Sequence, residues 1–161
     1  VRCMRALGIS ATIVADHADR FADLELPTIA DERPDHGPLG GLAAALKDCP
    51  HESWAFVTCC DLKVLRPQWF EQLRANISIE HQAIAFRDQA WQPLVALYNP
   101  ALLSTVTALL DSGDLSLQRL LDQVATQALE IPRDWLSPPS INTPKDLDAL
   151  RSQEPSHEHR P

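Results

Sequence analysis

One acidic residue, Asp61, stands directly after the most strand-like segment of the chain. That segment, Trp54 to Cys60, is a run of apolar and β-branched residues, a pattern typical of a buried strand in a parallel sheet. Open α/β sheets bind ligands outside the carboxyl ends of their strands. A Mg²⁺ ion takes one or two carboxylates there and completes its shell with water and substrate phosphates. Asp61 is therefore a candidate metal ligand, and an Asp that only caps the following turn is an equally weighted alternative.

A second candidate is the glycine-rich stretch 31–42, which holds Gly37, Gly40 and Gly41 among the five glycines of the chain. Glycine permits tight backbone geometry at the start of a helix, where free N–H groups attract anions. Because Asp31 ends the preceding extended piece, the stretch is a candidate nucleotide cradle. The alternative is a plain strand–loop–helix connection with packing glycines.

A third candidate, Asn142, comes just before Thr143-Pro144, which predict the start of a last helix with Thr143 as its N-cap. An Asn side chain both donates and accepts hydrogen bonds, so it could hold a ribose or phosphate oxygen. The commoner alternative is an Asn in the turn that precedes the cap.

The elements that must position these residues alternate between strands and helices. Strands are expected over residues 11–15, 27–30, 54–60, 81–86 and 93–98, with a further extended stretch at 127–131. Helices are expected over residues 1–7, 39–47, 67–76, 101–111 and 115–124, and from 143 onward. This alternation predicts an α/β fold with a mostly parallel sheet and helices on both faces. We expect one domain over 1–151 and a flexible polar tail over 152–161.

The composition is that of a single acidic globular domain. The chain has 161 residues, 45% of them hydrophobic, and a formal net charge of −8, which argues against broad nucleic-acid binding. No apolar run is long enough to cross a bilayer, and the four cysteines form no CxxC pair. We therefore expect a cytoplasmic protein with no nucleic-acid or membrane partner. The four tryptophans share no period, and we interpret them as core or interface residues.

Four segments, taken in order, resemble the molybdenum cofactor guanylyltransferases and their MobA-like nucleotidyltransferase relatives. They are Asp31 with Gly37-Pro38-Leu39-Gly40-Gly41-Leu42, the strand closing on Cys60-Asp61, Gln92-Pro93-Leu94-Val95-Ala96-Leu97-Tyr98, and Ile141-Asn142-Thr143-Pro144-Lys145-Asp146-Leu147. Their order and spacing are more specific than any single piece. The resemblance implies a Rossmann-like nucleotidyltransferase sheet and a reaction that joins GTP to molybdopterin and releases pyrophosphate.

The resemblance also implies a role for each matching residue. Asp61 is the Mg²⁺-binding, catalytic aspartate, and Asp31 is a nucleotide contact. Gly37, Leu39 and Gly41 form the loop that lies against the nucleotide, and Asn142 belongs to the late Asn-Thr-Pro motif on the substrate side. The implied mechanism is in-line attack by the molybdopterin phosphate on the α-phosphorus of GTP. Molybdoenzymes or their chaperones are the further partners it implies.

The chain departs from the family pattern at two places. The family opens with a strand, a Gly-rich loop carrying an arginine, and a lysine, and no such segment occurs here. We expect the chain to begin about one βα unit (roughly 30–40 residues) into the family pattern, with its first sheet strand missing. We then expect the strands at 11–15 and 54–60 to lack their shared neighbour. We also expect low activity, because the missing loop and lysine would have held the triphosphate. The second departure is Leu62-Lys63 after Asp61, where the family has a small residue or Met and then Pro.

These departures leave two alternative functions open. One is the transfer of another nucleotide, either CTP to molybdopterin or a nucleoside triphosphate to a sugar phosphate. The other is a catalytically inactive nucleotidyltransferase-like remnant that serves as a binding domain.

Overall fold

The computed structural model describes residues 4, 7–135, 143 and 145. Its strands are β1 (Ile13–Ala15), β2 (Thr28–Ala30), β3 (Ala55–Thr58), β4 (Ala83–Arg87), β5 (Trp91–Tyr98) and β6 (Thr126–Glu130). Its helices are α2 (Gly37–Asp48), α3 (Pro67–Arg74), α4 (Leu103–Ser112) and α5 (Leu117–Gln123), with short 3₁₀ turns at Ala22–Leu24, Pro34–His36 and Pro100–Leu102. The predicted alternation of strands and helices over 11–131 is confirmed. The last helix, Asn142 and the tail 152–161 lie outside the described residues, apart from Thr143 and Lys145, as does most of the helix at 1–7.

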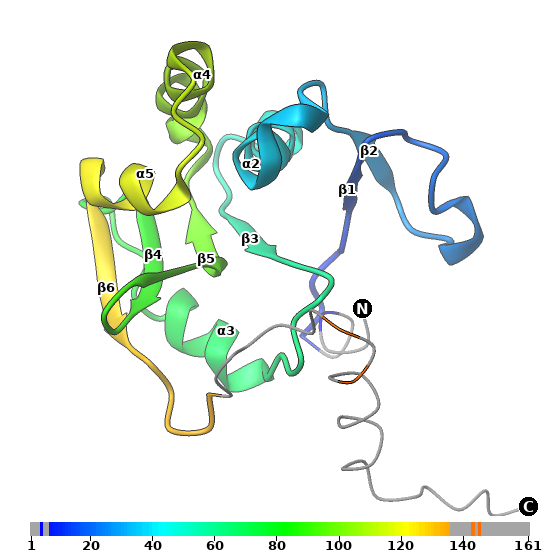
Figure 1. Cartoon of the computed structure of the whole chain (residues 1–161). Coiled ribbons are helices and arrows are strands. Elements are labelled where there is room, and N and C mark those ends of the chain that lie inside the picture. The colour runs from blue at the N-terminus through cyan, green and yellow to red at the C-terminus, as the bar shows by residue number, and fades with distance from the viewer. Residues whose placement is uncertain (1–3, 5–6, 136–142, 144, 146–161) are drawn as a thin grey trace, which may run out of the picture.

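The strands form two separate sheets (Figure 1). β1 and β2 pair in parallel, and the larger sheet has the order β3–β5–β4–β6. β5 runs antiparallel to both β3 and β4, whereas β4 and β6 are parallel. The α/β class is confirmed, but among the described strands the directly paired neighbours that run parallel are β1–β2 and β4–β6. The reason is the short connection 88–90, because a loop of this length joins antiparallel neighbours only.

Helices cover both faces of the larger sheet, as the sequence predicts. On β4, Ala83 and Ala85 face a core shared with α2, α4 and α5, whereas Ile84 and Phe86 face α3. This alternation follows from the two-residue period of a strand. Figure 1 shows α2, α4 and α5 above the sheet and α3 below it.

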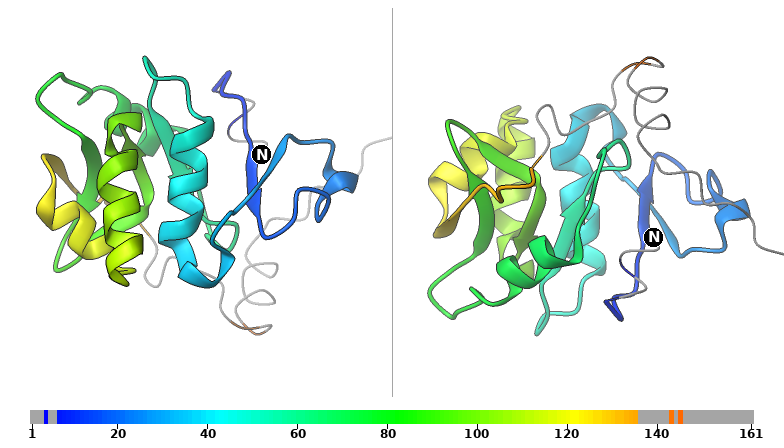
Figure 2. Two further views of the ribbon diagram at one scale, coloured as in Figure 1. Left: turned by 90° about the horizontal axis from the view of Figure 1, so that it is seen from above. Right: turned by 90° about the horizontal axis from the view of Figure 1, so that it is seen from below.

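Helix α2 connects the two sheets and sets the direction of β3. It contacts β1, β2 and β3 as well as α4. In the left panel of Figure 2, β1, β2 and β3 run in one direction and α2 runs back in the opposite direction. The carboxyl ends of β2 and β3 and the start of α2 therefore lie at the same edge of the molecule. In the described residues β1 pairs with β2 and β3 with β5, so β1 and β3 are not paired with each other.

Candidate functional site

The carboxyl end of β3 carries two polar atoms that have no partner. The strand ends at Thr58 rather than at Cys60, so Asp61 lies in the turn that follows and not directly at the strand end. Thr58 Oγ1 and Asp61 Oδ1 are both buried and make no hydrogen bond within the described part of the chain. Buried polar atoms without a partner are rare in native proteins. Their presence here indicates a place where water, an ion or a ligand completes the hydrogen bonding.

This donor set fits a magnesium ion better than a zinc ion. Among the residues that the structure describes, no group of three or more His, Cys, Asp and Glu side chains could enclose a metal. Mg²⁺ does not need such a group, since it is commonly held by one or two carboxylates, with water and substrate phosphates in the remaining positions. The Asp61 carboxylate, with the Thr58 hydroxyl close by in the chain, provides the hard oxygen ligands that this ion prefers.

The thiol next to this carboxylate is held in its neutral form. Burial raises the pKa of Cys59 to about 12, and the Asp61 carboxylate adds to the shift. A thiol with this pKa stays protonated at neutral pH. Cys59 therefore adds no negative charge to the end of β3.

The second part of the site is the loop between β2 and α2. The Asp31 N–H donates to the Ala15 carbonyl at 2.6 Å, and Asp31 Oδ1 accepts from the Arg33 N–H at 2.7 Å. A Cβ built at Gly40 would lie 3.0 and 3.1 Å from the two Asp31 carboxylate oxygens. The missing side chain of Gly40 thus allows the first turn of α2 to lie against Asp31, and the structure brings these two residues together.

The other predicted loop residues differ in what they can offer a ligand. Gly37 has a φ of +60° at the start of α2, a conformation that favours glycine. Gly41 is half-buried, whereas the Leu39 side chain is fully buried, so only the Leu39 backbone is left to meet a ligand. His36 Nδ1 is buried and makes no hydrogen bond to a described residue. The remaining predicted residue, Asn142, lies outside the described residues.

Sequence reasoning missed two of these polar groups, His36 and Thr58. In the described residues, the buried side-chain N and O atoms that lack a partner belong to His36, Thr58 and Asp61. All three lie either in the loop before α2 or at the end of β3 and the turn after it, the two segments at this edge of the molecule. Their place in the sequence could have identified them, since His36 directly precedes Gly37 and Thr58 is the last residue of β3.

The two parts of the site lie at one edge but line different cavities. A cavity of about 280 Å³ between α2 and α4 is bordered by Asp31 and Gly40, and not by Asp61. A cavity of about 120 Å³ at the end of β3 is bordered by Cys59 and Leu62, the residues on either side of the Cys60-Asp61 pair. The structure therefore brings Asp31 together with its loop, but not with Asp61 in one cavity.

The positive charge near the site is already partly neutralised. Arg33 pairs with Asp111 and Lys47 pairs with Glu32, each at 2.6 Å. Lys63, two residues after Asp61, is half-buried and has no ion-pair partner in the described part of the chain.

Residues 1–128 match the MobA-like NTP transferase domain. A Synechococcus elongatus protein named "Probable molybdenum cofactor guanylyltransferase" is 32% identical over 160 residues, covering 93% of this chain and 81% of the relative. The chain belongs to the MobA-like NTP transferase family. The Syntrophotalea carbinolica molybdenum cofactor guanylyltransferase is 26% identical over 94% of this chain and 76% of its own length.

Two solved structures are similar to this chain. A protein of Aquifex aeolicus superposes with a TM-score of 0.71 at 26% identity, covering 82% of this chain and 70% of that one. The Archaeoglobus fulgidus molybdopterin-guanine dinucleotide biosynthesis protein A gives a TM-score of 0.74 at 19% identity, with 92% of this chain and 81% of that chain covered. The second likeness concerns the fold alone. As a MobA-like NTP transferase, the chain is a nucleotidyltransferase. In the described residues no helix is long and apolar enough to span a membrane.

Proposed function

We propose that this chain transfers GMP from GTP to molybdopterin in a Mg²⁺-dependent reaction that releases pyrophosphate. The observation that supports this best is the pair of unpartnered buried oxygens at the end of β3, Thr58 Oγ1 and Asp61 Oδ1. They lie at the same edge as the start of α2 and the Asp31 loop. Relatives named molybdenum cofactor guanylyltransferase indicate which donor and acceptor to test first.

Each part of the site has a distinct role in this proposal. Asp61 holds the metal, which when bound supplies charge neutralisation for the triphosphate and the leaving pyrophosphate. The Asp31 loop and the backbone at Gly37 and Gly41 hold the nucleotide. A phosphate oxygen of molybdopterin forms a bond to the α-phosphorus while the bond from that phosphorus to the bridging oxygen breaks, and pyrophosphate leaves. Catalysis then depends on positioning and electrostatics rather than on a covalent intermediate.

We further propose that turnover by this chain is low. The net charge is −8, and Arg33 and Lys47, which border the loop, are engaged with Asp111 and Glu32. A triphosphate needs positive charge beyond that of one metal ion, because its own charge must be neutralised at close range. Lys63 is the basic residue that is best placed to supply it.

The experiment is a calorimetric titration of the chain with GTP and with CTP, each with and without Mg²⁺. We expect Mg²⁺-dependent GTP binding that Asp61→Asn abolishes. Asp48→Asn removes the same charge from an exposed position at the far end of α2, and should bind GTP as the wild type does.

Three outcomes would refute parts of this proposal. Nucleotide binding that survives Asp61→Asn would remove Asp61 from the metal site. Tighter binding of CTP than of GTP would identify CTP as the nucleotide substrate. No binding of either nucleotide would favour the alternative of a catalytically inactive binding domain. A pyrophosphate-release assay with molybdopterin measures turnover directly, and rapid release would contradict the low activity.

A further inference from the structure

The cavity at the end of β3 arises from a difference in strand length. β5 has eight residues and β3 has four, and β3 pairs only with Val95–Tyr98. Beyond Thr58 the chain turns away, so within the described residues the start of β5 has no strand beside it on that side. The resulting notch of about 120 Å³ is lined by Cys59, Leu62, Gln92, Pro93, Leu94, Val95 and Trp135.

One wall of this notch is a tryptophan held in a fixed orientation. The Trp135 ring lies 4.7 Å from the Trp69 ring and 5.8 Å from the Phe86 ring, measured between centroids. The preceding residue, Asp134, accepts a hydrogen bond from the Trp69 indole N–H at 2.9 Å and pairs with Arg66 at 2.6 Å. Trp135 therefore offers a rigid aromatic surface, which loses little conformational entropy when a flat ligand binds.

The polar side chain of the notch that is left without a partner is an amide. Gln92 is half-buried, and its side chain makes no hydrogen bond to any described residue. An amide presents one acceptor and two donors, so it can pair with a ring edge that carries an acceptor next to a donor. The other lining side chains are apolar apart from the Cys59 thiol and the Trp135 indole N–H.

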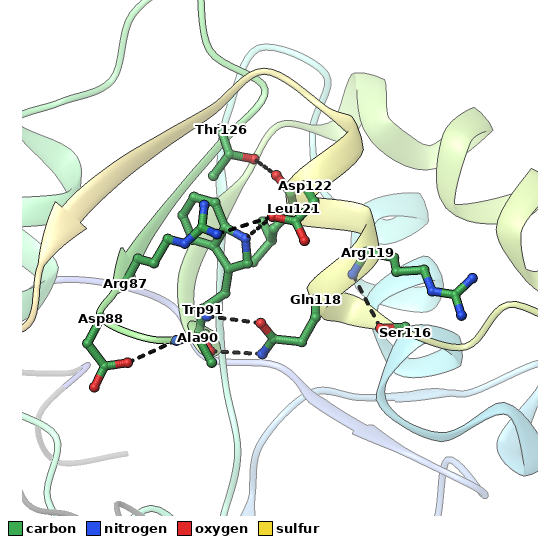
Figure 3. A network of polar contacts seen from close by, with 10 residues as sticks. All are labelled: Arg87, Asp88, Ala90, Trp91, Ser116, Gln118, Arg119, Leu121, Asp122 and Thr126. Atoms are coloured by element: carbon green, nitrogen blue, oxygen red, sulfur yellow. Dashed lines mark hydrogen bonds and ion pairs between the residues drawn. The ribbon is translucent and has the colours of Figure 1, made fainter.

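The backbone that carries Gln92 is clamped from the opposite face of the sheet (Figure 3). Gln118 of α5 accepts from the Trp91 N–H and donates to the Trp91 carbonyl, both at 2.9 Å. The Trp91 indole N–H donates to Asp122 at 2.8 Å, and the Arg87 guanidinium lies 4.4 Å from the Trp91 ring centroid. With Trp91 fixed in this way, the position of Gln92 at the notch is set before any ligand arrives.

The volume limits what the notch can hold. A cavity of about 150 Å³ accommodates a benzene molecule, so a notch of about 120 Å³ takes at most one six-membered ring and leaves the rest of the ligand outside. An aromatic wall together with an unpaired amide selects a flat ring with an amide-type edge, such as a 2-amino-4-oxopyrimidine ring. That ring occurs both in a pterin and in guanine, the base of GTP.

We propose that this notch binds the 2-amino-4-oxopyrimidine ring of the pterin acceptor, with Gln92 pairing to its polar edge and Trp135 against its face. This inference rests on the proposed function. The pterin is favoured over guanine because Asp31 and its loop follow β2, whereas the notch lies between β3 and β5. Asp61 lies in the turn after β3, and its neighbours Cys59 and Leu62 line the notch. A pterin bound in the notch would therefore lie close along the chain to the proposed metal ligand.

The test uses pterin itself as the probe, with binding followed by quenching of tryptophan and pterin fluorescence. Gln92→Leu keeps the approximate size of the side chain and removes the donor and the acceptor proposed to pair with the pterin ring. We therefore expect pterin to bind at least about tenfold more weakly. Gln123→Leu makes the same replacement at an exposed position on α5 and should bind pterin as the wild type does. Gln92→Glu keeps the shape of the side chain but removes its N–H donor. This variant replaces Gln92→Leu in the test if the leucine variant does not fold.

Competition with GTP separates the two sources of the ring. The proposal is supported if saturating Mg²⁺–GTP leaves pterin affinity unchanged and the Gln92 variants weaken pterin alone. It is overturned if GTP displaces pterin, since the notch then takes guanine, or if Gln92→Leu and Gln92→Glu bind pterin normally.

The same titrations distinguish a failure of the notch from a failure of the proposed function. Loss of Mg²⁺–GTP binding with retained Gln92-dependent pterin binding would refute the proposed function and leave the notch as a pterin site. Normal GTP binding without any dependence of pterin on Gln92 would refute the notch alone.

Discussion

Adjacent glycines in α2 should respond in opposite ways to the same substitution. A Cβ at Gly40 would lie 2.6 Å from the Arg33 carbonyl oxygen and 3.0 Å from the nearer Asp31 carboxylate oxygen. A Cβ at Gly41 would lie 3.8 Å from Val14 Cγ1, which is an ordinary van der Waals contact. Gly40→Ala and Gly41→Ala therefore share the gain in helix propensity and differ in the steric overlap.

The magnitudes follow from these two terms. Replacing Gly by Ala inside a helix stabilises by about 1 kcal/mol, which is the expected gain in free energy of unfolding for Gly41→Ala. Overpacking typically costs about 1–3 kcal/mol, and here the closest atom is a backbone oxygen that cannot rotate away. Gly40→Ala should therefore be neutral to destabilising by about 2 kcal/mol, and the two variants should differ by about 1–3 kcal/mol.

Urea denaturation followed by tryptophan fluorescence measures both variants on the same scale. We also expect Gly40→Ala to weaken GTP binding, because the added methyl group displaces the Asp31 carboxylate. If Gly40→Ala stabilised the protein as much as Gly41→Ala, the close approach of α2 to the Asp31 loop would be refuted.

Three further predictions concern β5, the strand that borders the notch. Gln118→Ala removes both hydrogen bonds to the Trp91 backbone and should lower the free energy of unfolding by about 1–3 kcal/mol. The control, Gln123→Ala at an exposed position, should change it by less than about 0.5 kcal/mol. Equal effects of the two substitutions in urea denaturation would contradict a stabilising role for the Gln118–Trp91 hydrogen bonds. Tyr98→Phe removes the hydroxyl that donates to the Pro93 carbonyl at 2.8 Å and should destabilise by about 1 kcal/mol. Burial raises the pKa of Tyr98 in the folded state, so the neutral phenol favours folding below the unfolded-state pKa of about 10, and this stability is lost as the pH rises above it. Because the chain has one tyrosine, tyrosinate absorbance reports this residue directly, and a phenol that ionises in the folded protein near pH ~10 would contradict its burial.

The sequence predicted the order of the elements because their signals are local. The apolar run before Asp61 contains β3, and Pro67 begins α3 as expected. The predicted strand, Trp54 to Cys60, was one residue too long at its start and two residues too long at its end. Its pairing with β5 stops at Thr58, where Val95 is the last partner, and adjacent cysteines carry no local signal for this end.

The features that the sequence did not predict depend on contacts between distant segments. One exception is the antiparallel direction of β5, which follows from its short local connection to β4 at residues 88–90. The notch requires Cys59, Gln92 and Trp135 to meet, and no periodicity links them. The unpartnered atoms of His36 and Thr58 are equally inaccessible to pattern reasoning, because burial and the lack of a hydrogen bond are properties of the folded chain.

The smaller sheet depends on α2 for its attachment. Of the residues in β1 and β2, Ala15 is the buried one, and the remainder are half-buried or exposed. Such a sheet has little core of its own, so in amide hydrogen exchange it should open before the larger sheet does. A nucleotide bound to the Asp31 loop would then slow the amide hydrogen exchange of β1 and β2 and leave that of β4 and β5 almost unchanged.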